Sequence, residues 1–229
     1  LIATAPYLYH NFSSAVDRDK VVFHLYESGY FHIWLFDTTQ NVSAENPKKI
    51  TGSILGSHSN PDISGNRIVY RSYRNGTEGI YVYDIKREME VDSLVRPFDP
   101  KQPVIDENIV LWHENRNQES NNDDVFMYDL DSKTVTRLTD NGVQQNFPKK
   151  SNDRIVWQED ISNLVEDVML YNLRSNSLQK VQPLAANSLL PILRTQPDID
   201  EDHIVYADNR ISHDTTNPYE WQLFDFSLQ

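Results

Sequence analysis

The 229-residue chain is predicted to be all-β, because one short pattern returns five times at a nearly constant spacing. In each copy, polar turn residues are followed by a hydrophobic pair and then by an aromatic residue. The copies end in Val21-Val22-Phe23, Ile68-Val69-Tyr70, Val110-Leu111-Trp112, Ile155-Val156-Trp157 and Ile204-Val205-Tyr206. They start 47, 42, 45 and 49 residues apart, and the two chain ends together supply 46 residues, which is one more period. Periods of this length are typical of solenoids and propellers.

The first half of each copy predicts a strand and a tight turn. A serine or proline stands seven residues before the hydrophobic pair, at Ser14, Pro61, Pro103, Pro148 and Pro197. Three residues later comes Asp or Ser, at Asp17, Ser64, Asp106, Ser151 and Asp200. Two further on comes Asp or Asn, at Asp19, Asn66, Asn108, Asp153 and Asp202. Such side chains bond nearby backbone N–H groups and favour turns, so we expect a strand, a turn and a β-branched strand in every copy.

A further strand follows in each copy and ends in Asp or Asn. Its copies are 33–37, 80–84, 125–129, 168–172 and 221–225. Four of the five are apolar on both faces, which is expected of strands that pack between neighbouring sheets. An outer strand is clear in 134–139 and weaker around Ile50, Leu94 and Val181.

Four strands in each of five repeats predict a five-bladed β-propeller with four-stranded antiparallel blades. We expect one domain over residues 1–229, with blades near 12–51, 58–96, 101–139, 146–182 and 195–229. The last repeat runs out after Asp225, and 1–4 resembles the outer strand at 137–139. The N-terminal strand is therefore expected to join the C-terminal blade, closing the ring and leaving no open edge.

The aromatic residues that end the pattern are expected to be buried between blades, because packing between blades needs a large side chain in each of them. These residues are Phe23, Tyr70, Trp112, Trp157 and Tyr206.

The segments 61–70 (PDISGNRIVY) and 75–84 (NGTEGIYVYD) resemble the TolB-like β-propeller repeat, and the resemblance extends blade by blade over essentially the whole chain. It implies a propeller of a microbial cell-envelope or surface protein, placed extracellularly, in the periplasm or on the cell surface. The chain departs from the family pattern because no copy contains Ser-Pro-Asp-Gly, and because it has five copies where the periplasmic TolB propeller has six. The matching motifs identify a blade rather than an activity.

The composition narrows the function. The formal net charge of −13 argues against binding nucleic acid or anionic membranes, which requires basic patches, and suits either a soluble, well-solvated surface protein or a cationic partner. No apolar run reaches the length of a membrane span. The absence of cysteine excludes disulfides and thiol catalysis. We expect a monomer that does not insert into membranes.

Evidence for catalysis is weak. The sequence contains no Gly-x-Ser-x-Gly nucleophile elbow and no P-loop. Five-bladed propellers also include glycosidases, which use paired carboxylates. Glu114, Glu159 and Asp208 share one position two residues after the aromatic and are the candidate acids. The alternative is a structural Asp/Glu-x-Arg motif, in which Arg116 and Arg210 pair with these acids.

No metal or cofactor is expected, although two weak candidates exist. His24 and His113 share the position after the aromatic and could approach a common channel. The loop 117–124 carries the oxygen-bearing residues Asn117, Glu119, Asn121 and Asp123, which faintly suggest calcium. A solvated acidic loop is the simpler interpretation.

The predicted ligand surface is the mouth of the axial channel, lined by the residues that precede the proline position. Its members are His58, Asn60, Gln102, Gln145, Asn146 and Gln196, with Asn11 and Arg194 beside them. Amide groups offer a donor and an acceptor together. We expect a non-catalytic module that binds a protein, peptide or glycan here. A glycosidase-like enzyme that acts on polysaccharide and a structural spacer within a larger surface protein are the alternatives, and the mouth could also hold only water.

Overall fold

The computed structural model describes residues 13–43, 46–96, 98–116, 122–162, 165–181, 194–208 and 222–227. Within these ranges the chain forms strands and turns and contains no helix. Among these residues there is accordingly no helix of the length and apolarity needed to cross a membrane. The all-β prediction is confirmed for this part of the chain.

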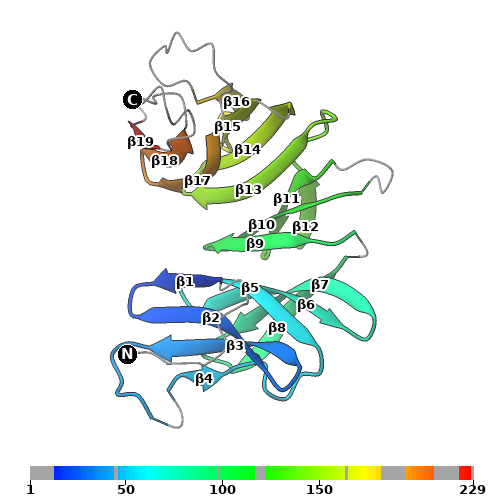
Figure 1. The fold of residues 1–229 in the computed structure, drawn as a ribbon, viewed down its shortest axis with the longest axis vertical. Helices are drawn as coiled ribbons and strands as arrows, with labels where there is room; N and C mark the ends of the chain where they lie inside the picture. Colours follow the sequence, from blue (N-terminus) through cyan, green and yellow to red (C-terminus); the bar gives the residue numbers. More distant parts are fainter. Residues whose placement is uncertain are drawn as a thin grey trace, which may run out of the picture. The chain divides into compact units, whose positions relative to one another are not determined.

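The described residues form five antiparallel sheets (Figure 1). Sheet 1 contains β1 (Ser14–Asp17), β2 (Lys20–Glu27), β3 (Tyr30–Asp37) and β4 (Lys48–Lys49). Sheet 2 contains β5 (Ser57–Ser64), β6 (Arg67–Arg74), β7 (Thr77–Asp84) and β8 (Met89–Val95). Sheet 3 contains β9 (Lys101–Asp106), β10 (Ile109–Glu114), β11 (Asp124–Asp129) and β12 (Thr134–Arg137). Sheet 4 contains β13 (Gln144–Ser151), β14 (Arg154–Ser162), β15 (Val165–Asn172) and β16 (Ser177–Lys180). Sheet 5 contains β17 (Arg194–Asp200), β18 (His203–Asp208) and β19 (Gln222–Ser227).

Each sheet is made of strands that are consecutive in the sequence, so one repeat builds one sheet. Sheets 1 to 4 have the expected four strands, whereas sheet 5 has three among the described residues. The segment expected to complete it, 1–4, lies outside the described residues. Closure into a ring of five blades therefore stays a prediction.

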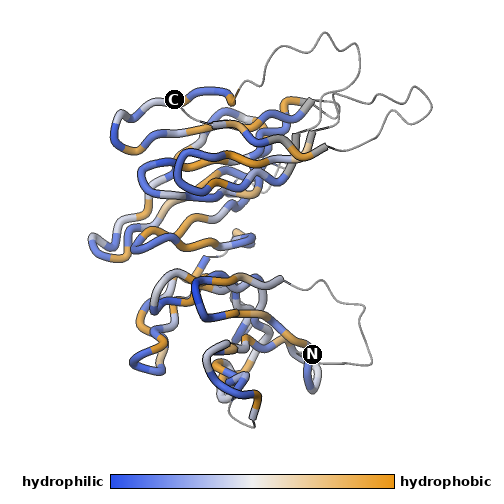
Figure 2. The backbone as a smooth tube through the Cα atoms, turned by 90° about the vertical axis from the view of Figure 1, so that its left-hand side faces the viewer, coloured by the Kyte–Doolittle hydropathy of each residue, from blue (hydrophilic) through white to orange (hydrophobic). Residues whose placement is uncertain are grey.

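The chain divides into two compact units, Leu1–Val95 and Arg96–Gln229. Unit 1 holds sheets 1 and 2, and unit 2 holds sheets 3 to 5. Within each unit the strands are hydrophobic along their middles and hydrophilic at the turns (Figure 2). The prediction of a single domain over 1–229 stays a prediction.

The turn after the first strand begins in the same way in every sheet. Its first residue has a positive φ each time, at Arg18, Gly65, Glu107, Asn152 and Glu201. The polar residue before this turn reaches the next sheet. Asp17 Oδ2 accepts a hydrogen bond from Gly65 N–H at 2.5 Å, and Ser151 Oγ accepts one from Glu201 N–H at 2.9 Å. The recurring Asp and Ser therefore also link neighbouring sheets.

The turn after the third strand is capped by the Asp or Asn that closes that strand, as predicted. Asp84 accepts from two backbone N–H groups, those of Lys86 and Arg87. Asn172 accepts in the same way from Arg174 and Ser175. The carboxylate at Asp129 does so too, and the hydrogen bonds to Ser132 and Asp131 hold its pKa below the usual value.

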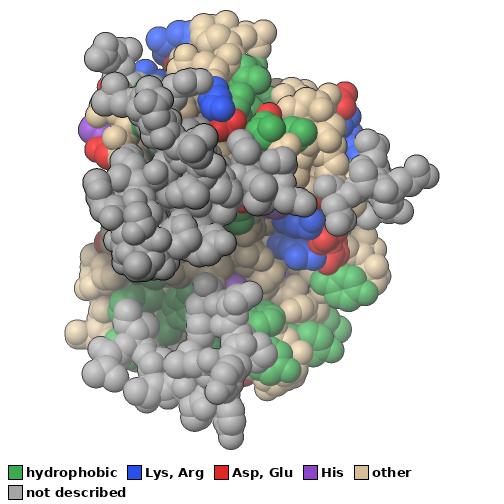
Figure 3. Space-filling model, turned by 45° about the horizontal axis from the view of Figure 1, so that its top comes forward, with side chains coloured by type: hydrophobic (Ala, Val, Ile, Leu, Met, Phe, Trp, Pro, Cys, Tyr) green, Lys and Arg blue, Asp and Glu red, His purple; other side chains and the backbone are tan. Residues whose placement is uncertain are grey.

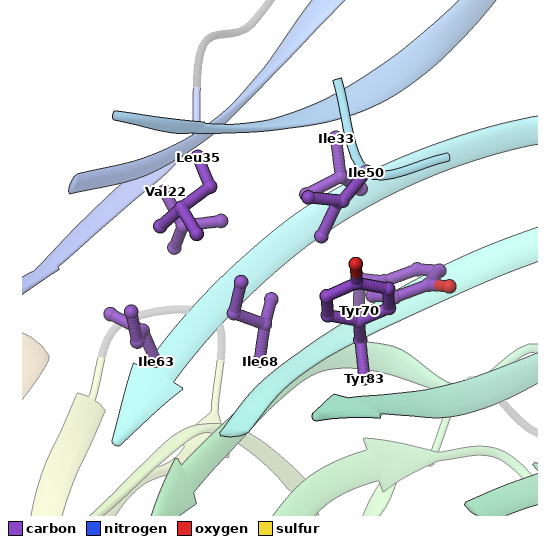
Figure 4. Packing of buried hydrophobic residues seen from close by; sticks show 8 residues of the cluster. All are labelled: Val22, Ile33, Leu35, Ile50, Ile63, Ile68, Tyr70 and Tyr83. Atoms are coloured by element: carbon purple, nitrogen blue, oxygen red, sulfur yellow. The ribbon is translucent and has the colours of Figure 1, made fainter. Parts of the chain in front are cut away.

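The core lies between the sheets. Val22, Ile33 and Leu35 of sheet 1 point toward Ile63 and Ile68 of sheet 2, and all five are buried (Figure 4). Two further clusters join sheets 3 and 4 and sheets 4 and 5. Strands that are covered by a sheet on each face need apolar residues on both, which explains the sequence pattern.

Four of the five aromatic residues are buried as predicted, because each faces the preceding sheet or a partner of its own sheet. Tyr70, Trp157 and Tyr206 belong to the clusters that join their sheets to the preceding ones. Trp112 stacks on Phe126 with ring centroids 5.7 Å apart.

Phe23 is a correction, because it is only partly buried. It occupies the position of Tyr70 in sheet 1, and among the described residues of unit 1 no sheet precedes sheet 1 to cover that face. The physical reason is therefore its place in the repeat series rather than its residue type.

Candidate ligand-binding site

A left-handed bulge interrupts the first strand of four sheets just before the proline position. Asn60, Gln102, Phe147 and Gln196 have φ between 47° and 53°. The pairing with the second strand shifts register there, between Ser59 and Asp62 for example. A left-handed backbone costs a non-glycine residue about 1–2 kcal/mol. Because the bulge recurs in four sheets, it belongs to the scaffold. The residues before it lie at the end of the sheets where the first strand begins.

The bulge of one sheet is held by the second strand of the sheet before it. Asn60 N–H donates to His24 Nδ1 at 3.3 Å, and Gln196 N–H donates to Gln158 Oε1 at 3.2 Å. His24 and Gln158 both follow the repeated aromatic residue. His24 is therefore a link between sheets. Among the described residues, no group of three or more His, Asp or Glu could hold a metal ion.

Two members of the predicted channel mouth, His58 and Gln145, are fully buried. His58 Nδ1 lies 2.9 Å from Ser72 Oγ, and its Nε2 lies 3.2 Å from Ile54 O. Gln145 Oε1 accepts from Thr139 Oγ1 at 2.9 Å. Burial lowers the pKa of His58. Both buried side chains hydrogen-bond to neighbouring parts of the chain. Their role toward a ligand stays a prediction.

Unit 2 contains a polar pocket of about 770 Å³ at this end of sheets 3 and 4. It is lined by Lys101, Asn115, Asp123, Gly142, Val143, Gln144, Asn146, Asp160, Ile161 and Glu166. Equivalent positions of the two sheets recur in it. Lys101 and Asn146 each stand two residues before the repeated proline, and Asn115 and Asp160 each stand three residues after the aromatic. Of the predicted mouth residues, Asn146 lines this pocket.

One wall of the pocket is a buried charged network around Asp123. Lys101 Nζ donates to both Asp123 oxygens, at 3.1 and 2.8 Å, and His113 Nδ1 lies 2.9 Å from Oδ2. Burial works to raise the pKa of Asp123, but the hydrogen bonds from His113 and Lys101 outweigh it and lower the pKa. His113 Nε2 lies 3.2 Å from Gln102 Oε1. Predicted mouth residue Gln102 thus supports this wall, and Asp123, a candidate calcium ligand, is already bonded to Lys101 and His113.

A chain of amides forms the floor. Gln144 Nε2 donates to Asn146 Oδ1 at 2.8 Å, and Gln144 Oε1 accepts from Asp123 N–H at 2.9 Å. Asn146 Nδ2 donates to Asp160 Oδ2 at 3.2 Å, and Gln158 Nε2 donates to Asp160 Oδ1 at 2.8 Å. The side chains of the floor orient one another, so the pocket is arranged before any ligand arrives.

Asp160 and Glu166 lie directly opposite each other on β14 and β15. Burial raises the pKa of Glu166, and the negative charge of Asp160 raises it further. Glu166 Oε2 is buried and has no hydrogen-bond partner among the described residues. This acidic pair is the strongest polar feature of the pocket.

Two of the candidate catalytic acids, Glu114 and Glu159, are absent from the lining of the pocket. Glu114 is 0% exposed and is bound by Arg96, by Arg116 Nε at 3.1 Å and by Trp112 Nε1 at 2.9 Å. The predicted pairing of Glu114 with Arg116 is therefore present, with Arg96 added. Glu159 is buried and accepts from Asn141 Nδ2 at 3.2 Å.

Other predicted residues cannot be placed in the site. For Asp208 and Arg194 the structure describes the backbone but not the side chain, while Asn11, Arg210 and 117–121 lie outside the described residues.

Sequence reasoning missed Lys101, Gln144, Asp160 and Glu166. A signal did exist, in the repeat position three residues after the aromatic. Sheets 1 and 2 carry Tyr26 and Tyr73 there, 48% and 52% exposed, whereas sheet 4 carries Asp160. The residue type at this position varies between the copies, with Asn115 in sheet 3, so the scaffold does not fix it. Glu166 had no such signal, because only strand pairing brings it beside Asp160.

No protein-family model matches the chain, and no curated protein matches it at a significant level. Solved structures do match. TolB from Acinetobacter baumannii superposes with a TM-score of 0.57 and 16% identity over 93% of this chain and 54% of the TolB chain. A chain of a nidogen/laminin complex gives 0.56 and 13% identity over 86% of this chain and 72% of that one.

The β-propeller domain of the Trilobed protease from Pyrococcus furiosus, which has an open velcro topology, gives a TM-score of 0.51. Its sequence is 12% identical over 94% of this chain and 80% of that one. The chain spans about half of the Acinetobacter TolB chain. The likeness shows the fold, a β-propeller similar to that of TolB.

Proposed function

We propose that the protein is a non-catalytic β-propeller binding module whose ligand occupies the polar pocket of unit 2. The observation that carries this proposal is the cavity of about 770 Å³ with side chains already oriented by hydrogen bonds. Pockets that combine volume with a few convergent polar groups are the usual ligand sites. The predicted mouth residues contribute to it in two ways: Asn146 lines the pocket and Gln102 supports its wall.

The state of the acids supports a binding role over hydrolysis. A catalytic carboxylate must reach its substrate, and Glu114 and Glu159 are buried beside their partners away from the pocket lining. Basic and acidic side chains lie next to each other on the face drawn in Figure 3. Hydrolysis assays on polysaccharides test the glycosidase alternative. If no ligand binds, the protein is a structural spacer.

The number of blades and the closure of the ring belong to the same proposal. The five sheets are five blades, and 1–4 supplies the strand that completes sheet 5 and closes the ring. One observation supports closure: sheet 5 has three strands among the described residues, where sheets 1 to 4 have four.

The setting is proposed from the resemblance. We place the protein outside the cytoplasm, in the periplasm, at the cell surface or in the medium, as a monomer. Propeller structures such as the one in the nidogen/laminin complex are consistent with an interaction role. The net charge of −13 disfavours nucleic acid, which leaves a protein, peptide or glycan as the ligand.

An array of peptides and glycans tests the proposal. Asn146→Ala and Gln144→Ala are expected to weaken the best array ligand about tenfold or more, corresponding to about 1.4 kcal/mol. Gln179→Ala is the control, because Gln179 is an exposed residue of β16 outside the pocket. No ligand on either array, or a ligand indifferent to both pocket substitutions, would reject the proposed site.

A further inference from the structure

Asp160 and Glu166 form an acidic pair that meets no cation among the described residues of unit 2. Asp124 and Asp167, two buried carboxylates elsewhere in the unit, do meet cations: Asp124 meets Arg137 at 2.6 Å, and Asp167 meets Lys180 at 2.5 Å. Glu159 is buried with an amide partner, Asn141, but it is a single acid rather than a pair. Asp160 accepts only from neutral amides, and neither it nor Glu166 forms an ion pair with a described residue. Like charges opposite each other on neighbouring strands destabilise a sheet, so this pair costs stability within the chain.

The nearby lysine does not relieve the repulsion. Lys101 lines the same pocket, but its ammonium group is held by both oxygens of Asp123. The charge that acts on Glu166 is the negative one of Asp160. Glu166 Oε2 also lacks a hydrogen-bond donor among the described residues, although it is buried. A buried acceptor without a donor is unfavourable, and this one belongs to a residue that lines an open cavity.

We propose that Asp160 and Glu166 bind the ammonium group of a lysine side chain in a peptide or protein ligand, an inference that rests on the proposed binding pocket. An ammonium group supplies three donors and one positive charge. It would donate a hydrogen bond to the unpaired Glu166 oxygen and would neutralise the repulsion between Asp160 and Glu166. Gln144 and Asn146 offer donor and acceptor groups to the peptide backbone beside it. A metal ion fits less well, since no group of three or more His, Asp or Glu among the described residues could hold one. The net charge of −13 would also attract a cationic ligand.

The test uses the whole protein and a fluorescein-labelled tetralysine amide, with the same peptide fully acetylated on its lysine side chains as the neutral probe. Asp160→Asn and Glu166→Gln keep the side-chain shapes and remove the charge. Each is expected to weaken tetralysine binding about tenfold, as measured by fluorescence anisotropy, while the acetylated probe binds weakly to all variants. Asp131→Asn is the matched control, because it removes one charge from an exposed turn at the far end of β11. It is expected to leave binding within about twofold.

A second measurement separates a ligand site from an internal ion pair. Glu166→Gln is expected to raise the melting temperature of the free protein, because the repulsion from Asp160 disappears while the unpaired Glu166 Oε2 has no hydrogen bond to lose. A lower melting temperature would mean that the chain itself neutralises the pair, and it would overturn the proposal. So would tetralysine binding that Asp131→Asn weakens as much as Asp160→Asn does. If an array ligand without lysine depends on Asn146 while tetralysine does not bind, the pocket is right and the ammonium assignment is wrong.

Discussion

At the scale of single residues, the surroundings of a side chain decide its role more than its type. Glu114 and Asp160 are both acids near the end of the second strand of a sheet. Glu114 is buried under Arg96 and Arg116 and accepts from Trp112, so its charge is satisfied. Asp160 faces a cavity with amide partners only. Glu114, which pairs with arginine, has a structural role. Asp160, at a repeat position where the residue type varies, lines the pocket.

His58 predicts how stability responds to acid. Burial places its pKa below the ordinary value of 6.5 in the folded protein, so the unfolded chain binds the proton more readily. The contribution of His58 is therefore fully present above about pH 6.5 and is lost as the pH falls toward the folded pKa. Each unit of depression corresponds to about 1.4 kcal/mol.

Urea unfolding at pH 7.5 and 5.5 checks this expectation. In His58→Gln the loss of unfolding free energy between the two pH values should be smaller than in the parent. His203→Gln is the control of opposite sign, because the hydrogen bond and charge of Asp225 raise the pKa of exposed His203. An unchanged pH dependence in His58→Gln would contradict the prediction.

At the scale of the element, the tight turn and the bulge define a blade-like sheet. The first turn residue is left-handed in all five sheets, yet only sheet 2 uses glycine there, Gly65. The bulge is left-handed at Asn60, Gln102 and Gln196. The backbone N–H of the bulge donates to a side chain of the preceding sheet, to His24 from Asn60 and to Gln158 from Gln196. Local strain is thus offset by contacts between neighbouring sheets.

Arg18 offers a test of the turn. Its φ is 54°, and the ion pair of its exposed side chain with a described residue is a 4.0 Å contact with Asp17. Arg18→Gly is expected to stabilise the protein by about 0.5–1 kcal/mol, because relief of the left-handed strain exceeds the added entropy of the unfolded chain. Chemical denaturation measures the change. Asn152→Gly, at the equivalent turn position, should gain less, because asparagine tolerates this backbone. A less stable Arg18→Gly protein would show that the side chain matters more than the backbone.

At the scale of the whole molecule, the repeat period accounts for five sheets and leaves one strand to be supplied. Deleting residues 1–5 is expected to lower the unfolding free energy by several kcal/mol, roughly the scale of a lost strand in a domain stable by about 5–15 kcal/mol. Guanidinium unfolding of the truncated and full chains measures it. Unchanged stability would favour an open arrangement, like the open velcro topology of the Pyrococcus furiosus propeller domain.

The strand order, the turns and most of the buried aromatic residues follow from the sequence alone, because they depend on side-chain period and on local hydrogen bonds that recur in every copy. Trp157 and the Asp84 turn could be predicted without any tertiary contact. The site, in contrast, is a product of the tertiary structure. Glu166 lies beside Asp160 through strand pairing, and His58 is buried through the bulge and the packing of its sheet. Both depend on which strands meet and which way a side chain turns, and neither is contained in the spacing of residues along the chain.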